Sequence, residues 1–389
     1  MHSNNTTTTV SEIAYLNICT GLEYVVNYSF SNHTYYNNSI NKSSLSDNQM
    51  SKSNIDSAII FAITVPILLV LCLAGILGNV GILISVECVQ LRKRSPLLML
   101  TLSLSAADAW VACVMAISFV VNSYLTRVSG ITQENVLCVL LTFEAFRMGA
   151  MITSIAHLFI LALNHYIGIL RPLHYNITIT TGLTIGLITA MWLLPPALTL
   201  AYFGLIPDQG FRSYECSNLS FFFQQKFRLT FSMALFFPLT VMIFVYVHVF
   251  ILLRRNRREH LTSRHRSKRH EQSNSHNVIQ RKQSKAVITT LLVLGTFITG
   301  WMPAVIRFIT FCENCVISET SLPITIALGI LTNSLILIKC IVDPIIYAAR
   351  VKEIKNGIWV VYHTRLGFRR IGGMDRASTM RLMVGYTAV

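Results

Sequence analysis

The sequence contains few charged residues and very few acidic ones. Of its 389 residues only 13% are charged, with 17 Asp and Glu against 32 Lys and Arg, whereas 53% are hydrophobic. Charged residues make up about a quarter of a typical soluble domain. This shortage of polar surface excludes a soluble globule of this length and indicates a membrane protein.

The chain also lacks the motifs of common enzymes. We find no metal-ligand triad, no Gly-rich phosphate loop and no hydrolase arrangement, so no enzyme activity, metal or cofactor is expected. A channel would show a ring of polar positions, and a transporter would show inverted repeats. Neither pattern is visible, but a channel or transporter is kept as an alternative of another class.

Seven apolar runs are long enough to cross a bilayer, whose hydrocarbon core requires about 20 helical residues. Prolines within them are tolerated, because neighbouring helices and water can satisfy the freed backbone groups. We therefore predict an all-α membrane protein, a bundle of seven transmembrane helices within residues 57–348. The runs are 57–87, 97–124, 137–163, 180–206, 228–253, 286–311 and 321–348.

Basic residues gather after the first, third, fifth and seventh runs. The segment 254–285 is dominated by Lys and Arg and contains only two acids, Glu259 and Glu271, and the tail 349–389 is also basic. By the positive-inside rule, both segments are predicted to be cytoplasmic and the N-terminus extracellular. The net charge of +15 therefore reflects topology and contact with membrane lipids, and no nucleic-acid partner is expected.

Residues 1–56 are rich in Asn, Ser and Thr, which predicts a disordered, glycosylated extracellular tail. No charged and apolar leader opens the chain, so the first span is expected to direct insertion into the plasma membrane. Acceptor triplets for N-glycosylation begin at Asn4, Asn5, Asn27, Asn32, Asn37 and Asn41, and another begins at Asn218 between the fourth and fifth spans.

Short motifs recur along the spans in a fixed order. Together they resemble the motifs of rhodopsin-like (class A) G-protein-coupled receptors, over nearly the whole membrane portion. The resemblance implies that an extracellular ligand moves the sixth span and so activates a heterotrimeric G protein, with arrestin as a further partner. The motifs are Gly78-Asn79-Val80, Leu104-Ser105-Ala106-Ala107-Asp108, Trp192, Pro238 with Tyr246, Phe297 through Trp301 to Pro303, and Asp343-Pro344 with Tyr347.

The same resemblance implies a disulfide. Five of the nine cysteines fall on the expected outer side. Because five is an odd number, at least one of them cannot form a disulfide with another of the five. Cys138 and Cys216 match the pair that in this family fastens the second outer loop over the pocket. Cys312 and Cys315 are candidates for a second, small disulfide loop.

Four polar residues on different spans are predicted to meet at similar depth: Asn79, Asp108, Ser154 and Asp343. Such groups must satisfy one another or enclose water and an ion. The resemblance implies a sodium ion, but Lys339 lies one turn before Asp343, where relatives carry a small polar residue. We hypothesise that its ammonium group replaces the sodium; the alternative is that Lys339 extends elsewhere.

The sixth span carries Trp301 two residues before Pro303, and proline leaves a hinge because it removes a backbone hydrogen bond. The resemblance assigns Phe297 and Trp301 to this switch. It also assigns Tyr246, Pro344 and Tyr347 to the open, coupling-competent form.

The third span ends in Asn164-His165-Tyr166, where the family has an acid, an arginine and a tyrosine. Loss of the charged pair removes the usual restraint, which would raise basal activity. A histidine also lacks the fixed charge and reach of arginine, which would weaken coupling. The sequence does not choose between these outcomes.

The ligand pocket is expected near Glu144, Arg147, Met148, Trp301 and Arg307. When positions are counted back from His165, Arg147 occupies the position where amine receptors carry an aspartate. When they are counted forward from Cys138, Ala145 occupies that position. The cations favour an acidic small molecule or a peptide as ligand. An amine bound by Glu144 is the alternative, although Glu144 can also simply pair with Arg147 at i,i+3. A non-signalling, scavenging binding protein is a further alternative.

After Tyr347, residues 351–368 mix large apolar residues with Lys and Arg. This composition predicts a short amphipathic helix on the inner membrane surface.

Overall fold

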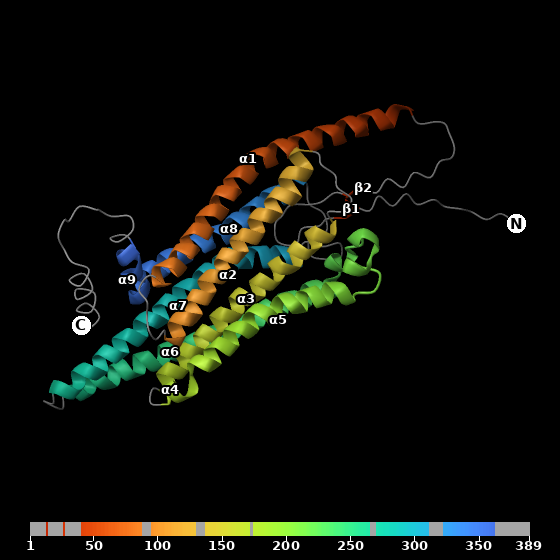
Figure 1. Ribbon diagram of the computed structural model, residues 1–389. Helices are drawn as coiled ribbons and strands as arrows, with labels where there is room; N and C mark the ends of the chain where they lie inside the picture. Colours follow the sequence, from red (N-terminus) through yellow and green to blue (C-terminus); the bar gives the residue numbers. More distant parts are fainter. Residues whose placement is uncertain are drawn as a thin grey trace, which may run out of the picture.

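The computed structural model describes residues 13–14, 26–27, 40–87, 95–129, 137–171, 174–264, 270–310 and 322–361. Seven long helices lie side by side in an elongated bundle (Figure 1). They are α1 (Ile40–Glu87), α2 (Pro96–Ser118), α3 (Leu137–Leu170), α5 (Thr181–Leu205), α6 (Gln225–Arg264), α7 (His270–Thr310) and α8 (Leu322–Arg350).

Shorter elements complete the described chain. A π-helix, η1 (Phe119–Val128), continues α2, and two short helices, α4 (Tyr175–Thr178) and α9 (Lys352–Val361), follow α3 and α8. Three 3₁₀ helices lie between α5 and α6: η3 (Gly210–Arg212), η4 (Tyr214–Cys216) and η5 (Ser220–Phe223). The strands β1 (Ile13–Ala14) and β2 (Val26–Asn27) pair antiparallel, with Ile13 opposite Asn27.

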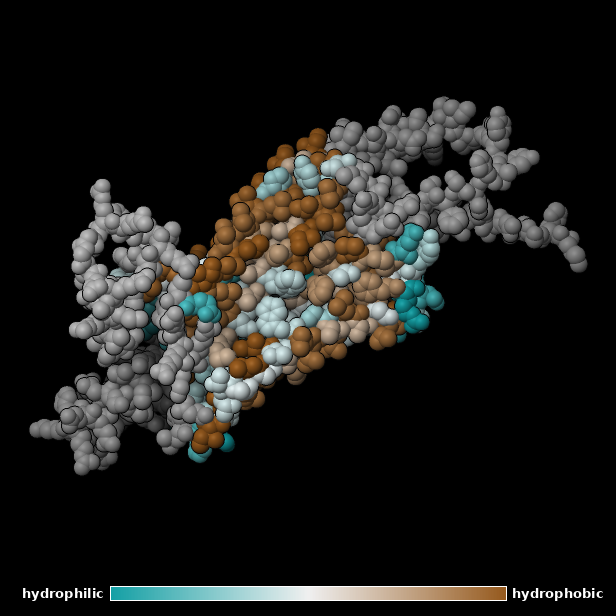
Figure 2. All heavy atoms as spheres, viewed as in Figure 1, coloured by the Kyte–Doolittle hydropathy of each residue, from teal (hydrophilic) through white to brown (hydrophobic). Residues whose placement is uncertain are grey.

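The prediction of a bundle of seven membrane-spanning helices is confirmed. Among the described residues, seven helical segments are long and apolar enough to cross a bilayer. Each coincides with a predicted run to within three residues at either end, except that the third continues to Leu170, beyond the predicted end at 163. Large apolar side chains such as Leu198 and Phe244 are more than 60% exposed. Hydrophobic residues (brown in Figure 2) cover the middle of the described surface, as expected of a surface that faces lipid.

The helices extend beyond the predicted spans. α1 begins at Ile40, within the segment predicted to be a disordered tail, and α6 and α7 enter the basic segment 254–285, so that only 265–269 lie outside the described residues there. Neither 40–56 nor 254–285 contains Gly or Pro. Because these are the two residues that interrupt helices most strongly, hydropathy marks where the spans end but not where the helices end.

Within 351–368, where a surface helix was predicted, the structure has α9 at Lys352–Val361. Its buried residues are Ile354 and Gly357, and it packs against α1 and α8, while Trp359 is exposed. We call this end of the bundle the α9 end, and the opposite end, which carries η3–η5, the loop end.

A close contact between α3 and α5 fixes their separation. A Cβ atom on Gly149 would lie only 2.7 Å from Cα of Pro196, which is backbone and cannot rotate away. At the same crossing, Thr199 donates a hydrogen bond to the carbonyl oxygen of Ala145 (3.0 Å). Only glycine therefore allows α3 and α5 to approach this closely.

Gly149→Ala is expected to lower the free energy of unfolding by about 1 to 3 kcal/mol, because the added methyl group forces the two helices apart. The measurement is the apparent melting temperature of the purified protein in detergent. Gly186→Ala, on α5 with no heavy atom within 4 Å of the added Cβ, is the matched control and should melt no lower than the unmodified protein. Equal melting temperatures of the two variants would contradict the proposed contact.

Candidate functional site

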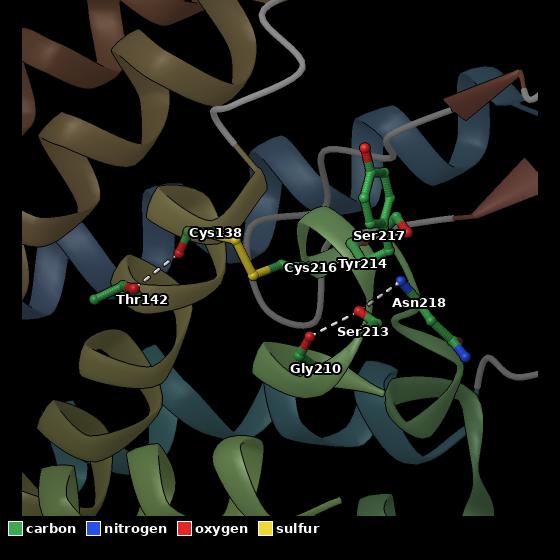
Figure 3. The surroundings of a disulfide bond; sticks show 8 residues. All are labelled: Cys138, Thr142, Gly210, Ser213, Tyr214, Cys216, Ser217 and Asn218. Atoms are coloured by element: carbon green, nitrogen blue, oxygen red, sulfur yellow. Dashed lines mark hydrogen bonds between the residues drawn. A yellow bond between two sulfur atoms is a disulfide. The ribbon is translucent and has the colours of Figure 1, made fainter. Parts of the chain in front are cut away.

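The loop end is fastened by the disulfide between Cys138, at the start of α3, and Cys216 in η4 (Figure 3). The predicted pairing is thereby confirmed. Hydrogen bonds from Gly210 N to Asn218 O and from Asn218 Nδ2 to Asp208 O, both 2.9 Å, make the connection compact. This disulfide holds η3–η5 over the end of α3.

The other residues predicted on the outer side are only partly described. Cys312 and Cys315 lie outside the described residues, and so do Asn4, Asn5, Asn32 and Asn37. Asn27 lies in β2 and Asn41 in α1, where the structure describes the backbone. The side chain of Asn218 is exposed, as an acceptor for glycosylation has to be.

One stripe of α3 packs against α5. The carbonyl of Ala145 accepts a hydrogen bond from Thr199, and Thr153 donates one to the carbonyl of Met191 (2.9 Å). Positions 145, 149 and 153 are four residues apart and so share one face of the helix. Ala145, one of the two candidates for the amine-binding position, therefore lies on the face that α5 covers.

A second stripe of α3 packs against α2. The ring of Phe146 meets that of Trp110 edge to face at 6.2 Å. Eleven residues further along, close to three full turns, Nε2 of His157 lies 2.7 Å from the hydroxyl of Ser103.

A third stripe contains the predicted ligand-binding residues of α3. Glu144, Arg147, Met148 and Met151 have the spacing i, i+3, i+4, i+7 that places side chains on one face. All four are at most 6% exposed, although neither α5 nor α2 covers this face. α3 also packs on α6 and α7, so this stripe is directed toward the interior of the bundle.

Within this stripe, Glu144 and Arg147 form a forked ion pair. Nε of Arg147 donates to Oε2 of Glu144 at 3.0 Å, and the second guanidinium nitrogen donates to Oε1. The exposed fractions of the two residues are 6% and 2%. The i,i+3 pairing considered from the sequence is therefore present, with both charges removed from solvent.

α7 supplies the other predicted pocket residues. Trp301 is buried, and its ring lies 6.5 Å from that of Phe297, which is also buried. Trp301 lies about two and a half turns before the end of α7, and Arg147 lies about two and a half turns after Cys138 on α3. The two residues are therefore at a similar distance from the loop end. Arg307, one to two turns above Trp301, is half-buried.

An aromatic cluster closes the bundle between η5, α6 and α7. Arg228 donates hydrogen bonds to the carbonyls of Phe222 and Phe308, both at 2.7 Å, and its guanidinium lies 4.8 Å from the centre of the Phe308 ring. These contacts were not predicted. They join α6 to η5 and to the end of α7.

A charged cluster occupies the middle of the bundle. The ammonium group of Lys339 contacts Oδ1 of Asp108 on α2, and it lies 3.0 Å from Oδ2 of Asp343 on its own helix α8. Thr296 on α7 donates to Oδ1 of Asp343 at 2.5 Å. All three charged residues are at most 2% exposed. Lys339 therefore joins two acids that α2 and α8 contribute, and Asp343 extends the cluster to α7.

The Lys339 ammonium contacts both carboxylates, which are the groups that a sodium ion would need. The residues present thus do not fit an additional sodium ion at this place. The lysine stem also lies against α7, because a Cβ on Gly300 would be 2.8 Å from Cβ of Lys339. A glycine at 300 is what makes room for a long side chain at 339.

Two other residues of the predicted ion site are placed differently. Asn79 donates to the carbonyls of Gly75 (2.9 Å) and Cys340 (2.8 Å) and accepts from the hydroxyl of Ser105 (2.9 Å), so it joins α1, α2 and α8 beside the charged cluster. The hydroxyl of Ser154 is buried and makes no hydrogen bond within the described residues.

Neutral hydrogen bonds replace charges at the α9 end of α3. Nε2 of His165 lies 2.7 Å from the hydroxyl of Thr290 on α7. Tyr175 on α4 donates to Oδ1 of Asn164 at 3.0 Å, and partial burial raises the pKa of its hydroxyl, so it stays protonated. The variant tripeptide is therefore fastened to α7 and α4.

The remaining predicted signalling residues lie on three helices. The hydroxyl of Tyr166 is 3.0 Å from Nδ1 of His248 on α6. Tyr246 and Tyr347 are buried, on α6 and α8. Pro303 lies inside α7 and Pro344 inside α8.

Comparison with known proteins decides the family. A model described as "7 transmembrane receptor (rhodopsin family)" matches residues 78–347, which is more than half of the chain. The chain belongs to this family. Its members are receptors and not enzymes, and they couple to G proteins.

Among similar curated proteins are three receptors named for amines. The receptor is 26% identical to trace amine-associated receptor 4 of Mus musculus, over 60% of this chain and 67% of the relative. It is 26% identical to octopamine receptor beta-2R of Chilo suppressalis, over 77% and 79%. It is 25% identical to 5-hydroxytryptamine receptor 7 of Xenopus laevis, over 75% of each chain.

Sequence reasoning missed several residues of these sites, among them Thr290, Thr296, Gly300 and Tyr175. A signal existed for Thr296, which is a polar residue on a largely apolar helix, one turn before Gly300 and so on the same face of α7 as Gly300. None existed for Thr290, because a threonine hydroxyl in a helix usually bonds to its own backbone, as that of Thr299 does here.

Replacement of Lys339 by serine should destabilise the receptor by about 3 to 5 kcal/mol in sodium-free buffer, because two buried carboxylates lose their cation. Sodium should restore part of this loss in the variant and have little effect on the unmodified receptor. The measurement is the apparent melting temperature in sodium chloride and in choline chloride at equal ionic strength. Lys352→Ser, at an exposed position of α9, is the control. A sodium shift as large in the unmodified receptor as in Lys339→Ser would refute the assignment.

Thr290→Val should raise signalling in the absence of ligand by about 2- to 10-fold, because one hydrogen bond that holds α7 against α3 is lost. The measurement is G-protein activation in cells, normalised to receptor at the surface. Thr299→Val, exposed on the same helix, removes a hydroxyl that bonds only within α7 and should leave the signal unchanged. Basal signals that are equal in the two variants would show that the bond to His165 does not restrain α7.

Proposed function

We propose that the receptor detects a small extracellular molecule that carries an amine and activates a heterotrimeric G protein at its α9 end. The observation that carries this proposal is Glu144, a buried carboxylate on the interior stripe of α3 within the loop half of the bundle. An ammonium group needs such an acid in a site removed from water. The names of the relatives support the amine over the acidic ligand favoured from the sequence.

The proposed orientation places the loop end outside the plasma membrane and the α9 end in the cytoplasm. It is supported by the basic residues of 254–285 and of the tail, and by the disulfide at the loop end, which suits an oxidising compartment. The G protein, and arrestin after it, would then approach the ends of α3, α6 and α7.

α7 is the proposed transmitter, because it contributes residues at the proposed ligand depth, to the charged cluster and to the α9 end of α3. Trp301 lies at ligand depth, Gly300 and Thr296 contact Lys339 and Asp343, and Thr290 bonds to His165. Pro303 removes one backbone hydrogen bond above these contacts and allows the helix to bend. A ligand that displaces Trp301 would therefore change all three contacts together.

The variant Asn164-His165-Tyr166 is proposed to restrain the inactive form by hydrogen bonding. A neutral bond is worth about 0.5 to 1.5 kcal/mol, less than a bond to a charged group. We therefore expect detectable signalling without ligand, and His165→Arg is the informative variant. If only His165→Arg activated G proteins, the natural protein would be a scavenging or arrestin-only receptor.

Glu144→Gln should lower the potency of an activating amine by about 10- to 100-fold, since it removes a charged hydrogen bond. The test applies tyramine, octopamine, serotonin and histamine to cells that express the full chain, with activation of the main Gα classes as readout. Glu215→Gln, in η4, is the control. Activation by an amine that Glu144→Gln leaves unchanged would assign the amine to another site.

A further inference from the structure

Toward the α9 end, α6 presents an apolar stripe to the outside of the bundle. Ile243, Val247 and Phe250 have the spacing i, i+4, i+7 that places side chains on one face of a helix, and all three are exposed. Tyr246 and Val249, which lie between them in the chain, are buried on the other face. Because this part of α6 belongs to a membrane-spanning segment, the exposed stripe faces lipid tails.

Arg254 is the next residue of this stripe, one turn after Phe250, and the first charged one. Its Cζ lies 4.4 Å from the centre of the Phe250 ring, so the guanidinium is held beside the lipid-facing stripe and is not extended into water. Arg254 is exposed and forms no ion pair with another described residue. The sequence also contains no acid between Gln225 and Arg258. The positive charge therefore needs a counter-charge from outside the helix.

The depth of Arg254 is that of lipid headgroups. The apolar segment of α6 ends at Leu252, and Arg254 follows two residues later, which is about 3 Å along a helix. Each headgroup layer of a bilayer is about 5 to 8 Å thick. A guanidinium at this level meets the phosphate groups of phospholipids, which can accept two parallel hydrogen bonds from it.

The sequence after Leu252 favours an anionic lipid over a neutral one. Arg254, Arg255, Arg257 and Arg258 follow the apolar segment directly. Four or more basic residues beside a transmembrane helix are typical of segments that bind phosphatidylserine or phosphorylated inositol lipids. An inositol headgroup that carries several phosphates offers more acceptors to neighbouring arginines than a single phosphodiester does.

We infer that the α9 end of α6 binds the phosphorylated headgroup of an anionic inositol lipid, with Arg254 on a phosphate and Phe250 as the residue that positions Arg254. This inference goes beyond the proposed function and uses only its orientation, which places the α9 end at the cytoplasmic leaflet, where anionic lipids lie. The phosphate supplies the missing counter-charge, and the tails cover the apolar stripe. An acidic segment of the G protein fits less well, because Arg254 lies on the side that faces lipid.

The test measures binding of a fluorescent phosphatidylinositol 4,5-bisphosphate to the purified full chain in mixed micelles of detergent and phosphatidylcholine. Saturable binding is expected. Arg254→Gln should weaken it about 10-fold, because a charged hydrogen bond to phosphate is lost. Arg350→Gln is the matched control, since it removes the same charge from an exposed position at the same end of the bundle, and it should bind like the unmodified receptor.

Two further variants separate a defined site from diffuse attraction. Arg254→Lys keeps the charge and loses the paired hydrogen bonds, so binding should weaken about 3- to 10-fold. Phe250→Leu keeps the apolar surface and removes the ring that holds Arg254, so binding should weaken about 2- to 5-fold. Attraction by charge alone would leave both variants unchanged. The melting temperature of each variant in phosphatidylcholine shows whether it folds.

The outcomes are distinct. Unlabelled phosphatidylinositol 4,5-bisphosphate should displace the probe, and phosphatidylserine at equal total charge should displace it at least 10-fold less well. If phosphatidylserine competes equally, or if Arg350→Gln weakens binding as much as Arg254→Gln, the inference is wrong. It is also wrong if Arg254→Gln leaves lipid binding unchanged and lowers G-protein activation in phosphatidylcholine vesicles, because the arginine would then serve the G protein. The binding measurement uses no amine, so its failure leaves the amine receptor standing.

Discussion

The ammonium group of Lys339 lies between the carboxylates of Asp108 and Asp343, in the middle of the bundle. A single charge placed at the centre of a bilayer costs about 2.5 to 3.5 kcal/mol on insertion scales. Three such charges are tolerated because each lies against an opposite charge. This requirement fixes how α2 and α8 approach each other, and it also reaches α7, since Thr296 bonds to Asp343 and Gly300 lies against the lysine stem.

The consequence for signalling follows from where these contacts are. α7 carries Trp301 directly after Gly300, so the residue that we propose lies next to the ligand and the residue that contacts Lys339 are neighbours in the chain. A movement of α7 that breaks the contact between Gly300 and Lys339 also affects the bond from Thr290, on the same helix, to His165 on α3. The contact of Gly300 with Lys339, the bond of Thr296 to the charged Asp343 and the bond of Thr290 to His165 therefore all act on α7. Restraints that act on one helix allow a small ligand to shift the receptor between two states.

Hydropathy predicted the seven spans, because the bilayer imposes one length on every helix that crosses it. It did not predict the extension of α1, α6 and α7 beyond the membrane, where only helix propensity acts. The sequence predicted that Lys339 would pair with an acid, because buried charges must be paired. The partners of His165 and Asn164 were not, because a threonine or tyrosine hydroxyl is one of many neutral groups and no energetic penalty singles it out. Counting from the motifs left two candidates for the amine-binding position. The contact between Ala145 and Thr199 places Ala145 against α5, whereas Arg147 lies on the interior stripe of α3.

The two buried charge clusters of this receptor obey the same rule but differ in what they connect. The cluster around Lys339 joins different helices, so to break it is to separate parts of the fold. The pair of Glu144 and Arg147 lies within one turn of α3, on the face where we propose that the ligand binds. Glu144 is therefore the acid that the proposed amine would reach, while the charges around Lys339 stay internal to the fold.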